Sequence, residues 1–192
     1  MKRAATSAKS LLYESLKTIT LSLPYTTRQD GRRAKNVPDI VRLCTQKLKD
    51  FVQDSDQNLK YLGLVGLVNL MRFSPEVVRE HRALVLECLN DDDVTIRLQA
   101  LELVTGMITK RNIESIVDKL SENVPTAEGH YREELISKII QICSREKYVD
   151  ITDFKWLVSV FSDLARTKGS EHEKMVGSKL MDVALRVPTV RA

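Results

Sequence analysis

The sequence DSDQNLKYLGLVGL at residues 54–67 is followed 37 residues later by DDDVTIRLQALELV at residues 91–104. The two stretches match in residue type at Asp54 and Asp91, Asp56 and Asp93, Leu59 and Ile96, Lys60 and Arg97, and Leu64 and Leu101. A further shift of 35 residues aligns Leu101 with Ile136. This period lies near that of HEAT and armadillo arrays, in which helical hairpins stack because no single hairpin can bury its own apolar face. We therefore predict an all-α fold, a HEAT/armadillo-like α-solenoid; the alternative is a compact globular bundle of helices.

Apolar residues recur at spacings of three and four along most of the chain, which predicts about nine antiparallel helices. The first is expected over residues 6–23, where Pro24 ends it. The others are expected to begin near Pro38, after Asp56, at Ser74, after Asp93, at Asn112, near residue 130, near Thr152 and at Ser170. The helix that begins at Ser74 is expected to continue to Leu89, and Gly169 is expected to cap the helix over residues 152–168.

The composition is typical of a folded helical domain. Seven glycines and five prolines among 192 residues are few, which argues against collagen-like, disordered and turn-rich all-β chains. The net charge of +4 is too small to indicate a nucleic-acid partner. The longest apolar run, residues 61–68, is too short to span a bilayer, and the N-terminal residues lack the apolar run of a signal peptide. We expect residues 1–192 to form a single solenoid segment of a cytoplasmic protein.

The three cysteines do not predict a catalytic or metal site. Cys44, Cys88 and Cys143 are widely spaced and form neither a disulfide framework nor a zinc pattern. Cys88 shares a predicted helix face with His81, but seven residues of helix rise about 10.5 Å, too far for a nucleophile to reach its base. We expect the cysteines to be small buried hydrophobic residues, and no catalytic residue is predicted.

Two short motifs imitate metal sites. The first three ligand positions of a calcium loop are matched by Asp54, Asp56 and Asn58. The glycine and glutamate that such a loop requires are replaced by leucine and valine, so these residues are better explained as a helix start. A zinc-protease motif begins at His172, but valine replaces its second histidine, and the spacing of Ser170 and Glu173 predicts a capping box. No metal and no cofactor are expected.

Gly63 and Gly66 lie inside a strongly periodic helical stretch. Each glycine costs about 1 kcal/mol relative to alanine in a helix interior. We expect them to be used for the close approach of a neighbouring helix.

Residues 25–36 (YTTRQDGRRAKN) form a long polar loop in the predicted fold. The loop carries four cations and one anion, Asp30; the cations are Arg28, Arg32, Arg33 and Lys35. The simpler interpretation is a solvated loop. The alternative is contact with an anionic membrane surface or an acidic partner, to which each basic residue near anionic lipid contributes about 1 kcal/mol. Nucleic acid is a weaker alternative because Tyr25 is the one aromatic residue beside these cations.

Several stretches resemble the trunk of the adaptins, the large chains of clathrin-adaptor-type coat complexes. They are residues 54–67, CLNDDDVTIRLQALELVTGMI at 88–108, NIESIVDKL at 112–120 and YREELISKIIQIC at 131–143. Within the adaptins, the segments at 8–19, 43–64, 151–169 and 180–191 are most similar to the delta-chain subfamily of the third adaptor complex. The resemblance covers nearly the whole sequence in the family's order. It departs at Leu157, where the family often has a second aromatic residue, and the loop at 25–36 has no counterpart.

The resemblance implies a non-enzymatic scaffold, an interior part of the trunk. Such a trunk assembles with a second large chain, a medium chain and a sigma chain. The complex is recruited to Golgi or endosomal membranes by an Arf-type GTPase, where it sorts cargo toward lysosomes or vacuoles. The resemblance carries over no cargo-binding or GTPase-binding residue. An interior solenoid segment is also expected to expose apolar faces around residues 11–16 and 181–185.

Two other classes of function remain open. One is a stand-alone helical-repeat receptor of the nuclear-transport type, which binds peptides in a groove lined by rows of Trp and Asn. The single tryptophan, Trp156, argues against it. The other is an enzyme that uses a cysteine, which would lose its activity when all three cysteines are replaced by serine.

Overall fold

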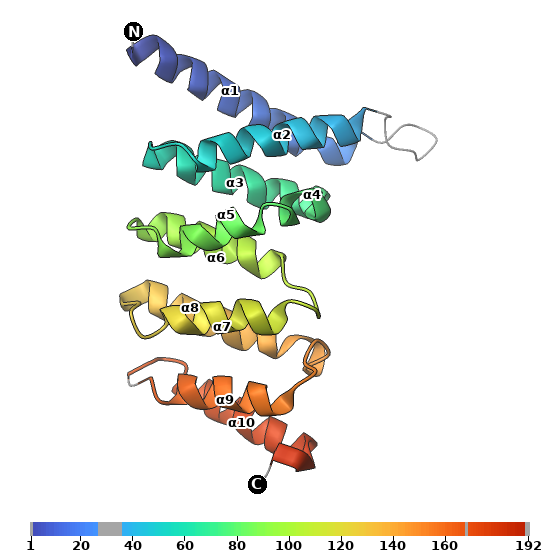
Figure 1. The fold of residues 1–192 in the computed structure, drawn as a ribbon, viewed down its shortest axis with the longest axis vertical. Coiled ribbons are helices and arrows are strands. Elements are labelled where there is room, and N and C mark those ends of the chain that lie inside the picture. Colours follow the sequence, from blue (N-terminus) through green and yellow to red (C-terminus); the bar gives the residue numbers. More distant parts are fainter. Residues whose placement is uncertain (1, 27–35, 168, 191–192) are drawn as a thin grey trace. The chain divides into compact units, whose positions relative to one another are not determined.

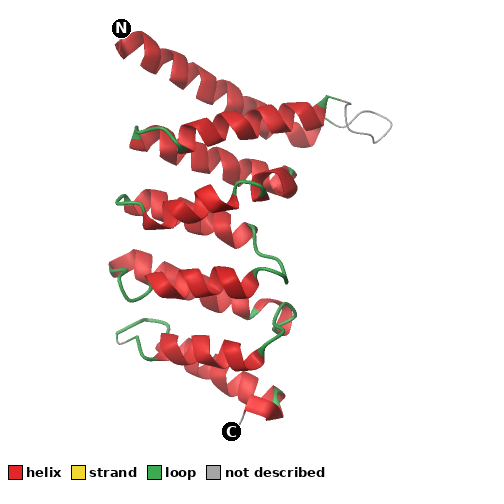
Figure 2. Ribbon diagram, viewed as in Figure 1, coloured by secondary structure: helices red, strands yellow, loops and turns green. Residues whose placement is uncertain are grey.

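The computed structural model describes residues 2–26, 36–167 and 169–190. Within these ranges the chain forms ten α-helices and four 3₁₀ turns, and no strand occurs in them (Figure 2). The chain divides into two compact units, Met1–Met107 (unit 1) and Ile108–Ala192 (unit 2). The predicted all-α class is confirmed.

Unit 1 is built from antiparallel helices that pack on their chain neighbours. Its elements are α1 (Lys2–Ser22), η1 (Leu23–Tyr25), α2 (Val37–Val52), α3 (Gln57–Phe73), α4 (Pro75–Arg79), α5 (Arg82–Glu87), η2 (Cys88–Asn90) and α6 (Val94–Gly106). Helix α1 contacts α2 and α3, α2 packs against α3, and α3 packs against α6 (Figure 1). Helix α3 therefore lies at the centre of this unit.

The two glycines of α3 permit its close contact with α2. A methyl group at Gly63 would lie 2.8 Å from the backbone nitrogen of Val52 and 2.9 Å from the carbonyl oxygen of Leu48. At Gly66 it would collide with the side chain of Leu48. Because ordinary carbon contacts begin near 3.5 Å, no larger residue fits at Gly63 without moving a backbone. The predicted role of both glycines is confirmed.

The helix expected from Ser74 to Leu89 is wrong as a continuous element. It is broken into α4 and α5, which raises the number of helices above the prediction. At the break, the backbone N–H of His81 donates to the carbonyl of Val78 at 3.0 Å. This bond spans three residues, as in a 3₁₀ turn, whereas an α-helical bond spans four. Both Val78 and Val85 are fully buried. The apolar stripe thus continues across a break in the backbone, which periodicity alone does not reveal.

Unit 2 contains two helical hairpins. Its elements are α7 (Ile113–Asn123), α8 (Gly129–Cys143), η3 (Arg145–Lys147), α9 (Phe154–Ala165), α10 (Glu173–Arg186) and η4 (Pro188–Val190). Helix α7 pairs with α8, α9 pairs with α10, and α9 also contacts α7 and α8 (Figure 1). The stacking of α7 on α9 is completed by hydrogen bonds from Thr152 Oγ1 to Glu114 at 3.0 Å and from the Trp156 indole N–H to Asp118 at 2.8 Å.

Helix α7 begins directly after Asn112, as expected, but two details of the predicted helix ends in unit 2 are wrong. The side chain of Asn112 does not cap α7; its Oδ1 accepts the backbone N–H of Thr109 at 2.6 Å, outside the helix. Helix α9 ends at Ala165, so Gly169, with φ of 74°, bends the following loop and does not cap the helix.

The predicted repeat register is confirmed by burial. Leu64, Leu101 and Ile136 occupy equivalent positions of successive repeats, and each is at most 1% exposed. Each places its side chain in the core on the packed face of its helix. Stacked helical hairpins with this repeated core constitute the predicted α-solenoid fold.

Candidate functional site

The sequence predicts an anionic contact at four cations, Arg28, Arg32, Arg33 and Lys35. All four lie outside the residues that the structure describes. Of the predicted loop at 25–36, only its edges are described. Tyr25 is 85% exposed, and Thr26 Oγ1 donates to the carbonyl of Leu23 at 2.6 Å. The anionic contact therefore stays a prediction.

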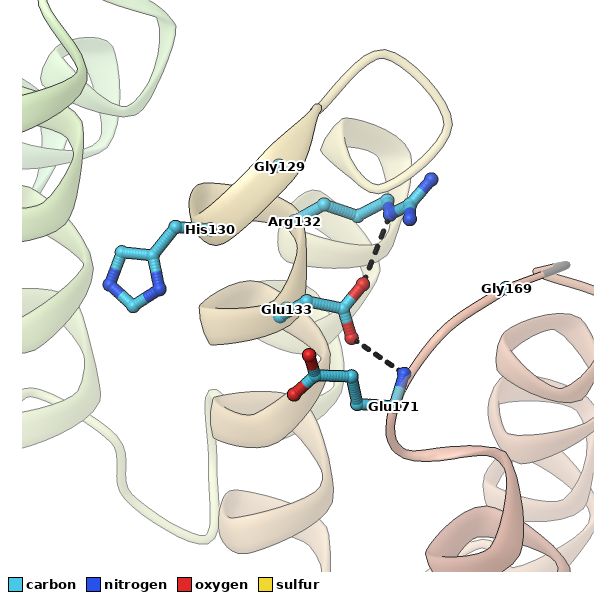
Figure 3. Close-up of a pocket in the computed structure, with 6 residues that line it drawn as sticks. All are labelled: Gly129, His130, Arg132, Glu133, Gly169 and Glu171. Carbon is cyan, nitrogen blue, oxygen red and sulfur yellow. Dashed lines mark hydrogen bonds and ion pairs between the residues drawn. The ribbon is translucent and has the colours of Figure 1, made fainter.

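A hollow of about 430 Å³ opens in unit 2 between the start of α8 and the α9–α10 loop (Figure 3). It is lined by Gly129, His130, Arg132, Glu133, Gly169 and Glu171. Both glycines have positive φ, 55° at Gly129 and 74° at Gly169, a conformation that side-chain-bearing residues rarely adopt. Glycine thus permits the two chain bends that border the hollow.

Glu133 connects the two elements that border the hollow. Its Oε1 accepts the Nε–H of Arg132 at 3.2 Å, and its Oε2 accepts the hydroxyl of Ser170 at 2.9 Å and the backbone N–H of Glu171 at 3.1 Å. Figure 3 draws the bonds to Arg132 and Glu171. Burial alone would raise the pKa of Glu133, but these hydrogen bonds outweigh it and lower the pKa. The ionised carboxylate therefore fastens the α9–α10 loop to α8.

The predicted capping box contributes to the same junction, though not as a box at the helix start. Ser170 Oγ accepts the N–H of His172 at 3.1 Å, and Glu173 Oε1 accepts the N–H of Gly169 at 3.0 Å. Both bonds lie one residue earlier than a capping box requires, so they stabilise the loop before α10. The hydrogen bond of Glu173 to Gly169 accounts for the glutamate of the zinc-protease motif that begins at His172 without a metal. Among the described residues, no three His, Cys, Asp or Glu side chains gather to hold a metal ion.

Equivalent aspartates cap successive helices of unit 1. Asp56 Oδ1 accepts the N–H of Asn58 at 2.9 Å at the start of α3, and Asp93 Oδ1 accepts the N–H of Thr95 at 2.7 Å at the start of α6. Of the three residues that imitate a calcium loop, Asp56 is therefore the helix cap and Asn58 donates the capped N–H, so this stretch is a helix start, as the sequence predicts.

The preceding aspartate of each pair joins neighbouring helices. Asp54 Oδ1 accepts the N–H two residues ahead at 3.0 Å, and Asp91 Oδ1 does the same at 3.0 Å. The other oxygen of each binds a lysine from an earlier helix: Lys9 to Asp54 at 2.5 Å and Lys60 to Asp91 at 2.7 Å. The repeated Asp-x-Asp motif thus caps one helix and ties its first turn to α1 or α3.

The Lys60–Asp91 pair is the more buried of the two, with side chains 23% and 9% exposed. Burial would raise the pKa of Asp91, but the bonds from Lys60 and from the N–H of Asp93 lower it below its usual range. The same hydrogen bond raises the pKa of Lys60. Both groups are therefore charged at neutral pH, and their mutual attraction offsets the desolvation penalty of burying each charge.

The turn after α8 has an unusual backbone. Glu146, Lys147 and Tyr148 have φ of 43°, 60° and 69°, and none is glycine. The left-handed region costs an L-residue about 1–2 kcal/mol. Tyr148 is buried, and its hydroxyl donates to Asp182 Oδ2 of α10 at 2.9 Å. Burial and this bond raise the pKa of Tyr148 to about 12, so the phenol stays protonated and can donate.

The cysteines are buried and protonated. Burial raises the pKa of Cys88 to about 11 and that of Cys143 to about 12, and it also raises the pKa of Cys44. The Cys88 thiol donates to the carbonyl of Leu84 at 3.4 Å. Burial lowers the pKa of His81, which stands at the start of α5. A thiolate nucleophile needs the opposite shift, so these thiols are unsuited to covalent catalysis at neutral pH.

The predicted apolar faces are partly exposed. In α1, Leu11 is 71% exposed, while Leu16 is buried. In α10, Met181 and Leu185 are 64% and 67% exposed, while Val183 between them is buried. Each of these helices thus buries some of its apolar side chains in the core and exposes others.

Glu133, Tyr148 and Asp182 escape prediction from the sequence. Their partners lie 34 to 38 residues away in the sequence, which is about the length of one repeat. The repeat period could have directed attention to such pairs. The residue types alone do not single them out from other surface carboxylates and tyrosines.

None of the described helices is long and apolar enough to cross a membrane. The chain is 44% identical over 183 residues to the AP-3 complex subunit delta of Dictyostelium discoideum, covering 95% of this chain and 15% of that protein. It is 43% identical over 189 residues to the AP-3 complex subunit delta-1 of Bos taurus, covering 97% and 15%. The chain thus spans less than a fifth of these relatives.

The fold is also similar to that of one chain in a larger complex. A chain in a homology model of the full-length AP-3 complex in an intermediate open conformation superposes with a TM-score of 0.71 at 22% identity, covering 96% of this chain and 35% of that one. This match concerns the fold alone. The family model described as the adaptin N terminal region matches residues 1–192. From its repeats, its helical stacking and this match over its full length, the chain belongs to the adaptin family.

Proposed function

We propose that this chain is a scaffold segment of a vesicle-coat adaptor complex that acts in protein transport from the Golgi or endosomes to lysosomes or vacuoles. The observation that carries the proposal is the 43–44% identity to AP-3 delta subunits over 95–97% of the chain. Its partners would be a second large chain, a medium chain and a sigma chain. An Arf-type GTPase and the membrane would be engaged through the whole complex, which would be peripheral on Golgi or endosomal membranes.

The side-chain chemistry supports a scaffold and not an enzyme. Asp91 is used for an inter-helix ion pair and Glu133 for a loop junction, and the cysteine thiols are protonated. The indole N–H of Trp156, which a peptide receptor would present in its groove, is bonded to Asp118 of a neighbouring helix. These polar groups stabilise the stack of helices.

A binding experiment tests the scaffold function. The tagged chain is incubated with co-expressed AP-3 large, medium and sigma chains, and an α-solenoid of similar size from an unrelated family serves as control. We expect this chain to retain the adaptor chains and the control solenoid not to retain them. Equal retention by both baits, or by neither, would contradict the proposal.

We also propose that the basic loop contacts an anionic surface. The variant replaces its four cations by serine: Arg28, Arg32, Arg33 and Lys35. At about 1 kcal/mol for each basic residue near anionic lipid, this variant should sediment much less with phosphatidylserine vesicles than the parent. A matched control replaces the exposed pair Lys110 and Arg111, which lies in another loop. If parent and loop variant sediment equally, the proposed contact is wrong and the loop is a solvated segment.

A further inference from the structure

The segment between α8 and α9 combines a strained backbone with a buried anchor. Three consecutive residues, Glu146, Lys147 and Tyr148, are left-handed. Residues other than glycine visit this region as single residues, and a run of three persists only where the surrounding structure holds it. The strain is therefore balanced by contacts made elsewhere in unit 2.

Those contacts converge on Tyr148. Its side chain is 5% exposed, and its ring meets Phe154 of α9 edge-on at 6.4 Å between centroids. Its hydroxyl donates to Asp182 Oδ2 at 2.9 Å, and the other oxygen of Asp182 accepts the Nε–H of Arg186 at 2.7 Å. The anchor thus joins the turn to both α9 and α10.

The backbone around the anchor is closed by short-range bonds. The N–H groups of Tyr148 and Val149 donate to the carbonyl of Arg145 at 2.9 and 3.3 Å, and the N–H of Ile151 donates to the carbonyl of Tyr148 at 3.0 Å. In this closed form Arg145, Glu146 and Lys147 are exposed.

We propose that residues 145–150 form a two-state turn, with the Tyr148–Asp182 hydrogen bond as its latch. In the closed state the left-handed backbone is held by the latch and by burial of the phenol ring. In the open state residues 146–148 return to the unstrained region, Tyr148 leaves Asp182, and α10 loses its attachment to the turn. A partner that contacts the turn in one state alone shifts the balance, so the turn is a conformational control point within the scaffold.

Hydrogen exchange of the intact chain tests the latch. Exchange of the amides of Tyr148, Val149 and Ile151 is followed by mass spectrometry in the parent and in Tyr148→Phe. Loss of a hydrogen bond to a charged group should accelerate their exchange at least about tenfold. Asp182→Ala is a second latch variant and Asp163→Ala is its matched control. Both carboxylates pair with an arginine three or four residues later in the sequence, but only Asp182 also accepts the tyrosine hydroxyl. Acceleration is expected for Asp182→Ala, as for Tyr148→Phe, and not for Asp163→Ala.

The strain is tested separately at Lys147. Glycine adopts a φ of 60° without penalty, whereas alanine retains the strain. Lys147→Gly should therefore exchange about fivefold more slowly at these amides than Lys147→Ala. This comparison remains decisive if Tyr148→Phe unfolds unit 2. Equal exchange in Tyr148→Phe and the parent would overturn the latch, and equal exchange in the glycine and alanine variants would overturn the strained turn.

Discussion

Replacing Gly63 by alanine tests the contact between α2 and α3. The added methyl group would lie 2.8 Å from Val52 Cγ2 and from the Val52 backbone nitrogen, and 2.9 Å from the Leu48 carbonyl oxygen. Overpacking of a core costs about 1–3 kcal/mol, and the upper end applies because two of these atoms are backbone and cannot rotate away. Alanine returns about 1 kcal/mol of helix propensity. The expected net loss is about 2 kcal/mol.

Gly177 in α10 provides the matched control. It also lies inside a helix, but a methyl group there would meet nothing within 4 Å. Gly177→Ala should therefore stabilise the chain by about 1 kcal/mol through helix propensity alone. The two identical substitutions are expected to act in opposite directions, and they differ by about 3 kcal/mol.

Urea unfolding followed by far-ultraviolet circular dichroism measures both variants. With a slope of about 2 kcal/mol per molar urea, the midpoint of Gly63→Ala should fall by about 1 M, while that of Gly177→Ala should rise by about 0.5 M. If Gly63→Ala is as stable as the parent or more stable, the close contact between α2 and α3 is wrong.

Three further predictions concern the core, an ion pair and a thiol. Leu101→Asp places a charge at a site 1% exposed and should cost several kcal/mol; a circular-dichroism melt equal to that of the parent would contradict the repeat register. Lys60→Ala should cost about 1–2 kcal/mol at pH 7, whereas Lys47→Ala, whose pair is half exposed, should change stability little. Folding lowers the pKa of Asp91, so the stabilising effect of the pair is present above the unfolded pKa and is lost as the pH falls through the folded pKa. The urea midpoints of parent and Lys60→Ala should therefore approach each other as the pH falls below the usual pKa of an aspartate. Cys88, whose pKa is raised to about 11, should react with a thiol reagent at pH 8 only after unfolding; rapid labelling of the folded chain would show that the thiol is accessible.

The repeated elements are those that the sequence predicts best. Asp56 and Asp93 cap their helices as expected, because an N-cap acts on amides two or three residues away and is a local interaction. The role of Gly63 is also predictable from the sequence. Glycine is unfavourable in a helix interior, so its presence in a periodic helix indicates close packing against a neighbour, which the structure shows. Local chemistry and a fixed period are enough for these assignments.

The errors fall at helix ends and breaks. Asn112 and Ser170 have the residue types of helix caps, yet their side chains bond outside the expected positions. Both can satisfy more than one neighbouring amide, and the loop conformation selects between them. The break before His81 leaves the apolar stripe intact, so the pattern that predicts the helix is unaffected by it.

The sequence alone determined the all-α class, the repeat period and its register, because these follow from local spacing of apolar and capping residues. Tertiary structure decided which polar groups meet: Glu133 with Ser170, and Tyr148 with Asp182. In each pair a helix residue meets a residue of a turn or loop 34 to 37 positions away, and the contact depends on how the hairpins stack and on the turns between them. A periodic sequence specifies that neighbouring hairpins touch, whereas the packed backbone selects the atoms that do so.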